Sequence, residues 1–410
     1  MEIKPGFLHK KVLFLLLALF ALTLPLSKSV SAILLGLVSL YLLGTAFLNR
    51  HLREELRAGL KGPLVLPLFL YTAVLALGLL ISEDLMEGLD RVRSAFPVLL
   101  IYFVVSVFLN LNREEERERG GMLLISAFIT GTVLLNVVGL LEYSGVIGNR
   151  KYLILEPLNM HHIWYGNLNA VALYAGLGLF LFSSGKYKWL GFSSAFLALP
   201  CILFAQSRGV WLGVLLTVMA SATLLSSRRK MAFSLLILIL IALLFSFYFI
   251  SDVFRERIDL ARSDIALFYS GDADTSLGTR FLMWKAALRI FFANPLFGAG
   301  TGDYMVSVSK MIASGETPLF VGEYNQPHNM YLFLLAVNGI PGLFAYLFIY
   351  YAGFNISLRL LGGNKSFFGL TGFAVLFHYL FAGVFDLTNT QMMSYALALV
   401  MGSCLSKGEG

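Results

Sequence analysis

The chain has 410 residues, of which 58% are hydrophobic and only 13% are charged, and its mean hydropathy is +0.78. This composition is typical of a membrane protein, because each helix that crosses a hydrocarbon core of roughly 30 Å needs about 20 mostly apolar residues. The apolar runs show no strand-like alternation, so they are predicted to be helices rather than strands of a barrel. The net charge of +7 arises without a basic block interleaved with aromatic residues, which excludes a nucleic-acid surface.

Twelve apolar runs are predicted to cross the membrane. They cover residues 12–27, 29–48, 63–81, 95–111, 122–143, 163–183, 189–205, 209–226, 231–251, 329–352, 367–384 and 388–405. The first run follows Lys10 and Lys11, as in a signal peptide, but no small-residue cleavage site follows it, so we expect it to stay as a helix. Cys201 and Cys404 lie in or beside apolar runs and are too few for a disulfide framework or a metal site.

The loops between these runs differ in their content of Lys and Arg. With the N-terminus in the cytoplasm, the inner segments include the basic stretches 50–61 and 228–230. The short outer loops contain only Lys28, Arg91, Arg93, Arg150, Lys151 and Arg208. Because cytoplasmic loops are enriched in these residues, both termini are predicted to be cytoplasmic. The helices then fall within 1–250 and 329–410, and the polar segment 251–328 faces outward. In a bacterium this side is the periplasm or the cell exterior, where a substrate must arrive already activated.

The outward segment is predicted to form a loop domain with amphipathic helices that lie along the membrane surface. A second helix is expected to begin near Thr279 and to stop before Asn294 and Pro295, followed by a glycine-rich turn and a third short helix after Asp303. The first helix is indicated by apolar residues at four-three-four-three spacing, namely Phe254, Ile258, Ala261, Ile265 and Phe268.

His328 lies at the start of the apolar run that follows this loop, directly after Pro327, which is a natural helix starter. The positive end of a helix disfavours imidazolium, so we expect a neutral His328 that can act as a general base. A histidine that only caps or packs is the alternative. His161 and His162 also face outward and compete for this function, whereas His378 lies inside a run, where bonds to other helices are expected.

Two arginines are candidate anion ligands. Arg208 interrupts a nearly continuous apolar stretch from 190 to 225, and an arginine so close to lipid either snorkels to the surface or meets an anion. Arg280 is predicted to begin the second loop helix, where the dipole does not favour a cation, so an external anion or simple solvation would stabilise it. Arginines that converge on one site would match the oxygens of a diphosphate.

Arg91 and Arg93 are weaker candidates for substrate binding. They lie in the outer segment 83–94 beside Glu87 and Asp90, so local salt bridges are the favoured interpretation.

Several motifs are absent from the sequence. It contains no phosphate-binding P-loop, no His-Glu-x-x-His and no Gly-x-Ser-x-Gly. Gly298, Gly300 and Gly302 do not follow a strand, so a dinucleotide-binding loop is not expected. The acidic residues of the loop have no spacing that demands a metal ion; they include Asp272, Asp274 and Asp303. No metal and no cofactor are therefore predicted.

Three segments resemble the superfamily of O-antigen ligases and O-antigen polymerases. Residues 207–213, Ser-Arg-Gly-Val-Trp-Leu-Gly, are similar to its Ser-Arg-Gly-x-x-x-Gly element. Residues 279–300, which begin Thr-Arg-Phe and end Asn-Pro-Leu-Phe-Gly-Ala-Gly, are similar to its loop helix and Pro-x-x-Gly-x-Gly turn. Residues 327–342 contain a Pro-His-Asn-x-Tyr-Leu element like that of the family, and 166–169 carry a weaker similarity.

The resemblance implies a multi-pass α-helical glycosyltransferase of the GT-C type in the bacterial inner membrane. Its donor would be a glycan on undecaprenyl diphosphate, with no metal or nucleotide required. Arg208 and Arg280 would neutralise the departing diphosphate, and His328 would deprotonate the acceptor hydroxyl, with inversion at the anomeric carbon. Neighbouring candidates for substrate contacts are Gln326, Asn329, Tyr331, Arg91 and Arg93.

The acceptor separates the family members. A ligase transfers the glycan to a sugar of lipid A-core, and a polymerase transfers it to another carrier-linked unit. The ligase is favoured because the chain ends soon after its last apolar run, whereas protein O-oligosaccharyltransferases usually carry more C-terminal sequence. A lipid or sugar transporter is less favoured, because no internal repeat is evident and the distinctive charges gather at the outer face.

Overall fold

The computed structural model describes residues 5–147, 155–225, 252–270, 274–363, 365–388 and 390–406, with scattered positions between 231 and 249. This part of the chain is helical and contains no β-strand, which confirms the predicted all-α class. The helices of the bundle are α1 (Pro5–Thr23), α2 (Lys28–Leu48), α3 (Arg50–Gly59), α4 (Val65–Gly78), α5 (Leu85–Asn110), α6 (Glu114–Tyr143), α7 (His162–Phe182), α8 (Gly185–Phe204), α9 (Arg208–Thr223), α14 (Met330–Gly362), α15 (Ser366–Ala382) and α16 (Gln391–Cys404). The outward segment contains α11 (Asp252–Tyr269), α12 (Ser276–Ala293) and α13 (Tyr304–Ala313), and short 3-10 turns lie at Leu79–Ile81, Pro157–Asn159 and Leu319–Glu323.

Six described helices are long and apolar enough to cross a membrane, namely α2, α5, α6, α7, α8 and α14. Shorter apolar helices are α4 with its 3-10 extension, α9, α15 and α16. The chain is therefore a multi-pass membrane protein. Most of the predicted runs coincide with one of the bundle helices, but the count of twelve stays a prediction, and much of the run 231–251 lies outside the described residues.

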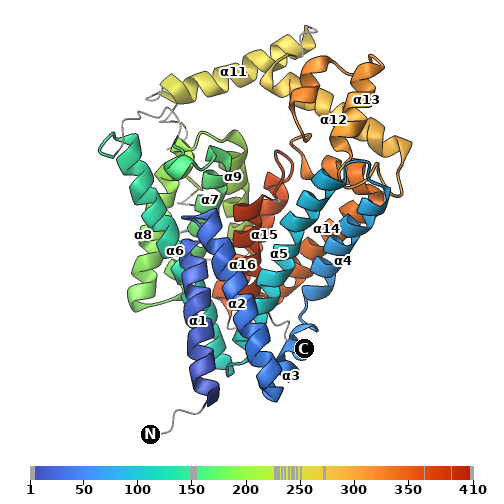
Figure 1. The fold of residues 1–410 in the computed structure, drawn as a ribbon. Coiled ribbons are helices and arrows are strands. Elements are labelled where there is room, and N and C mark those ends of the chain that lie inside the picture. The colour runs from blue at the N-terminus through green and yellow to red at the C-terminus, as the bar shows by residue number, and fades with distance from the viewer. Residues whose placement is uncertain are drawn as a thin grey trace.

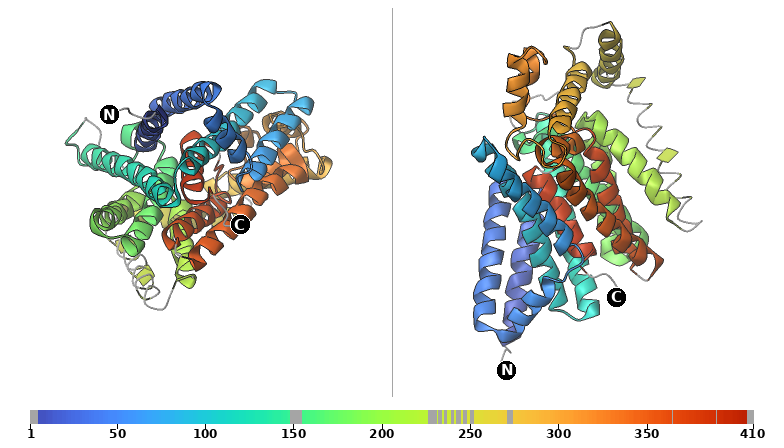
Figure 2. Two further views of the ribbon diagram at one scale, coloured as in Figure 1. Left: turned by 90° about the horizontal axis from the view of Figure 1, so that it is seen from below. Right: turned by 90° about the vertical axis from the view of Figure 1, so that its right-hand side faces the viewer.

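The helices form one bundle with the outward segment at a single end. Helices α11, α12 and α13 lie across the top of the bundle, and both marked termini lie at the opposite end (Figure 1). The side view shows the same separation (Figure 2, right). Helix α16 lies inside the bundle, with every residue from Met392 to Cys404 buried, and it packs on α5, α6, α7 and α15.

The glycine-rich turn joins the outward segment to the bundle. Its backbone runs against a bend of α14, where Gly300 N donates to Val337 O at 3.0 Å and Ile340 N donates to Pro295 O at 3.0 Å. Gly298 has φ +70°, and a Cβ there would lie 2.4 Å from the carbonyl carbon of Val337. Only glycine permits this backbone conformation together with such a close approach. The turn therefore forms a joint between α12 and α14. This close backbone contact accounts for Gly298, so no nucleotide-binding role is needed to explain it.

Asp303 completes this joint. Its carboxylate accepts hydrogen bonds from Glu83 N at 2.8 Å and from Asp84 N at 2.9 Å, and so holds the loop that precedes α5. Thr301 Oγ1 donates to Leu75 O of α4 at 2.7 Å. The Asp303 carboxylate thus serves backbone groups, and among the described residues no cluster of three or more His, Cys, Asp or Glu could hold a metal ion.

Two local predictions differ from the structure. Helix α12 begins at Ser276, because Thr275 caps it through a bond from Gly278 N, so Arg280 lies in its second turn and not at its start. Helix α14 begins at Met330, capped by Asn329, so Pro327 does not start it. In both places a capping side chain, which satisfies free N–H groups, sets the boundary.

The first loop helix is confirmed as α11, but its predicted apolar face is only partly covered. Ile258 is half-buried, whereas Ile265 is 47% exposed. The side chains of Phe254, Ala261 and Phe268 lie outside the described part.

Candidate functional site

A cavity of about 570 Å³ lies between the bundle and helix α12. Its walls come from the starts of α7, α9 and α12, from the segment before α14 and from the loop between α15 and α16. Arg208, Arg280, His328 and Gln326 all line it. The structure therefore brings together the three residues that the sequence proposed for chemistry, although they come from three separate elements.

Arg208 is the first residue of α9, after the N-cap residue Ser207. A short break with Gln206 at φ +52° precedes it, and Trp211 Nε1 fixes that break by donating to Ile202 O at 2.8 Å. The free N–H groups and the dipole at a helix start favour an anion. Arg208 adds a positive charge at this place, so this wall of the cavity is suited to an anionic group.

Arg280, on α12, lines the same cavity as Arg208. Its Nη1 donates to Phe385 O at 3.0 Å. Burial lowers the pKa of Arg280, the negative charge of Asp386 opposes this, and the positive charge of Arg208 lowers the pKa further. Two arginines that repel each other in a partly desolvated space would both be stabilised by a shared anion.

His328 faces Asp386, with 3.1 Å between its Nδ1 and the Oδ1 of the carboxylate. An ionised carboxylate can only accept a hydrogen bond, so in the neutral ring of His328 the proton is on Nδ1 and Nε2 keeps a lone pair. The backbone of His328 is left-handed, with φ +48°, and Trp284 Nε1 holds the preceding turn by donating to Pro327 O at 3.0 Å. Non-glycine residues in this conformation are strained and are concentrated at functional sites.

Asp386 was not predicted from the sequence. It lies in the loop between α15 and α16, where Leu387 N donates to its Oδ1 at 2.8 Å and Gln326 Nε2 lies 3.4 Å from the same atom. Thr388 anchors this loop to α14 through Tyr346, with 2.8 Å between the hydroxyl oxygens. One acidic residue between two apolar runs was the available signal, because ionisable groups near a membrane interior are costly and commonly functional.

His161 and His162 line the same cavity from the start of α7. The two histidines that compete with His328 are thus in reach of the same bound molecule. His162 Nδ1 lies 2.9 Å from Glu156 Oε1.

The other residues predicted near the substrate do not line this cavity. Asn329 caps α14, where its Oδ1 accepts from Tyr331 N and Leu332 N at 3.0 Å each. The Tyr331 hydroxyl donates to Leu380 O. Both side chains therefore fix the backbone that carries His328.

Arg91 and Arg93 form the predicted local salt bridges. Arg91 pairs with Glu87 at 2.5 Å and Arg93 pairs with Asp90 at 3.1 Å. The guanidinium of Arg91 also lies over the Phe333 ring at 4.8 Å, whereas Arg93 is 71% exposed. Neither arginine lines the cavity of Arg208 and His328.

His378 bonds across helices, as predicted. Its Nδ1 lies 2.9 Å from the Tyr174 hydroxyl and its Nε2 lies 2.9 Å from Asn167 Oδ1, both on α7. Asn167 in turn lines the cavity. His378 is fully buried, so it supports the floor of the site.

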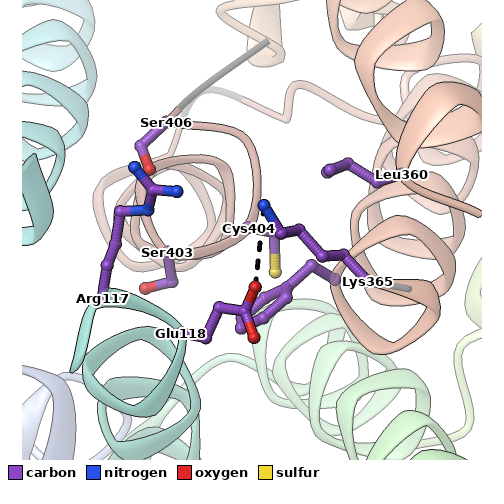
Figure 3. Close-up of a pocket in the computed structure, with 8 residues that line it drawn as sticks. Arg117, Glu118, Leu360, Lys365, Ser403, Cys404 and Ser406 are labelled. Carbon is purple, nitrogen blue, oxygen red and sulfur yellow. Dashed lines mark ion pairs between the residues drawn. The ribbon is translucent and has the colours of Figure 1, made fainter. Parts of the chain in front are cut away.

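A second cavity, of about 30 Å³, lies at the end of the bundle that carries the termini, beside Ser403, Cys404 and Ser406. Lys365 points between the helices toward Glu118, with 3.6 Å between Nζ and Oε1 (Figure 3). Such a space holds one or two water molecules. The ion pair between Lys365 and Glu118 links α6 to the connection between α14 and α15, which accounts for both charged side chains.

Residues 193–347 match a protein-family model described as O-antigen ligase. The chain is also 26% identical over 293 residues to an uncharacterized protein of Haemophilus influenzae, with 70% of each chain covered. It is 22% identical over 192 residues to an O-antigen ligase of Escherichia coli, with 46% of each chain covered. These matches confirm the resemblance to the O-antigen ligase and polymerase superfamily, and they point to that general type of membrane glycosyltransferase function. The family match includes Arg208, Arg280 and His328 and ends before Asp386.

Proposed function

From the match of residues 193–347 to the O-antigen ligase family, we propose that this protein is an O-antigen ligase of the GT-C type. It transfers a glycan from undecaprenyl diphosphate to a sugar hydroxyl of lipid A-core, at the periplasmic face of the bacterial inner membrane. The observation that carries the proposal is the shared cavity lined by Arg208, Arg280 and His328.

The arginines bind the diphosphate of the donor. Arg208 at the start of α9 and Arg280 on α12 contact its oxygens, which removes the repulsion between the two guanidinium groups. Negative charge grows on the diphosphate as the glycosidic bond breaks. Positive groups held in advance around that charge lower the barrier, and a lipid diphosphate needs no general acid to leave.

His328 activates the acceptor. Its Nε2 takes the proton of the attacking hydroxyl, while Asp386 holds the ring through Nδ1 and stabilises the imidazolium that forms. The hydroxyl oxygen then bonds to the anomeric carbon on the face opposite the diphosphate, so the configuration inverts. The lipid diphosphate leaves with the electron pair of the broken bond, and the proton on His328 passes to solvent.

The test is an in vitro transfer reaction. Purified protein is incubated with undecaprenyl-diphosphate glycan and lipid A-core, with a chelator and without nucleotide, and the products are resolved on a gel. A shift of lipid A-core supports the ligase and its independence from metal. A ladder of carrier-linked glycan with unshifted lipid A-core would replace the ligase by the polymerase. No product with either acceptor would contradict a glycosyltransferase of this type and favour a transporter.

A further inference from the structure

One wall of the cavity has no part in the mechanism above. His161, His162 and Trp164, at the start of α7, line the space that also contains Arg208 and His328. The two imidazole rings are stacked, with centroids 4.4 Å apart and planes at 27°. This wall is polar and aromatic and is formed largely within one turn of a helix.

The hydrogen bonds of His162 fix its free nitrogen as an acceptor. Glu156 Oε1 lies 3.2 Å from His162 N and 2.9 Å from its ring Nδ1. Burial disfavours the ionised form of Glu156, but the hydrogen bonds from His162, together with the electrostatic influence of His162 and His161, outweigh it and the pKa of Glu156 is lowered. Because the carboxylate accepts at Nδ1, the neutral His162 ring keeps a lone pair on Nε2.

The free nitrogen of His161 is a donor. Its Nδ1 caps α7 by accepting from Ile163 N at 3.4 Å, so the proton of the neutral ring is on Nε2. Burial lowers the pKa of His161, and the neighbouring His162 lowers it further, which keeps the ring neutral near pH 7. The stacked pair therefore presents one donor and one acceptor side by side.

Trp164 extends this wall with an aromatic surface. Lys28 Nζ lies over its ring at 3.9 Å, and the His161 ring lies 5.7 Å from it. An indole combines a large apolar surface with fixed geometry, which suits the C–H face of a sugar ring.

We propose that His161, His162 and Trp164 form the acceptor subsite of the cavity. Neighbouring hydroxyl groups of the acceptor sugar bond to the two rings, one hydroxyl accepting from His161 Nε2 and the other donating to His162 Nε2, while the sugar packs beside Trp164. The inference rests on the proposed function and names the wall that receives the acceptor. His328 and Asp386 line the same cavity as His161, so a hydroxyl of this sugar would face the base.

Two substitutions remove one hydrogen bond each while keeping the local structure. His161→Asn retains a good helix cap but loses the Nε2 donor, and His162→Asn keeps a donor at the position of Nδ1, toward Glu156, but has no group at the position of the Nε2 acceptor. Each variant is expected to raise the KM for lipid A-core about tenfold, as the loss of one such bond implies, with the donor KM within about twofold. His9→Asn is the matched control, because His9 bonds to Tyr41 at 2.9 Å and does not line the cavity.

An equilibrium measurement separates this inference from the proposed reaction. Binding of lipid A-core without donor is titrated against His328→Ala protein and against the same protein with His161→Asn. Weaker binding in the second protein supports the subsite even if transfer is never observed, in which case the reaction alone is wrong. Equal binding, or a rise in the donor KM in place of the acceptor KM, would overturn the subsite.

Discussion

At the scale of single residues, the site depends on partners that are far apart in the chain. His328 and Asp386 are separated by 58 positions, and Arg280 reaches the backbone of Phe385 beside that aspartate. The sequence identified Arg208 as a break in apolar sequence, His328 from its place at the start of an apolar run, and Arg280 from its expected place at the start of a loop helix. It did not pair His328 with Asp386, since a pairing set by tertiary packing leaves no local pattern.

Asp386→Asn tests the support given to His328. The amide no longer carries the charge that stabilises the imidazolium, so we expect kcat to fall roughly 10²–10³-fold, within the range of lost acid–base assistance. The donor KM should stay within about threefold, and Asp386→Glu should restore part of the rate. Asp90→Asn, at a largely exposed salt bridge, is the control. A loss of donor binding with unchanged kcat would assign Asp386 to a different function.

Arg280→Lys tests the diphosphate contact. Lysine keeps the charge but lacks the planar fork that matches phosphate oxygens, so we expect kcat/KM for the donor to fall about 10- to 100-fold. Arg289→Lys on the same helix is the matched control, because Arg289 contacts Glu316 at 3.1 Å at the surface. Equal kinetics for the two variants would remove Arg280 from the site.

At the scale of elements, the position of the site depends on one local backbone contact, the joint between the glycine-rich turn and the bend of α14. The glycine-rich turn fixes α12 to the bend of α14, and the same bend follows the segment that carries His328. Hydropathy and spacing are local properties, so the apolar helices and α11 to α13 could be predicted. The starts of α12 and α14 were missed because Thr275 and Asn329 decide them through capping bonds.

Gly298→Ala tests this joint. Left-handed backbone costs a non-glycine residue about 1–2 kcal/mol, and the new Cβ would also lie 2.4 Å from the Val337 carbonyl carbon. The control is Gly315→Ala, because Gly315 has φ +76° but none of the described atoms would lie within 4 Å of its added Cβ. In thermal unfolding, we expect a larger drop in Tm for Gly298→Ala, together with slower transfer. Equal shifts in Tm would mean that the close approach contributes nothing.

At the scale of the whole molecule, the proposed reaction requires that the outward helices and the cavity face the periplasm. Both native cysteines are buried, so single cysteines can report orientation. We expect Ser314→Cys, after α13, to react with a membrane-impermeant maleimide in intact spheroplasts, and Ala58→Cys, in α3 at the other end, to react only after lysis. Both positions are exposed in the structure. The reverse pattern would place the cavity in the cytoplasm and exclude a flipped donor.

The most direct measurement of the central claim is the rate of transfer by His328→Ala in the purified system, with His9→Asn as the control. The account predicts that His328→Ala binds the donor normally but transfers the glycan about 10²–10⁴-fold more slowly, while the control matches the unmodified protein. A rate for His328→Ala within about threefold of the unmodified protein would contradict the assignment of His328 as the base and, with it, the mechanism derived from this cavity.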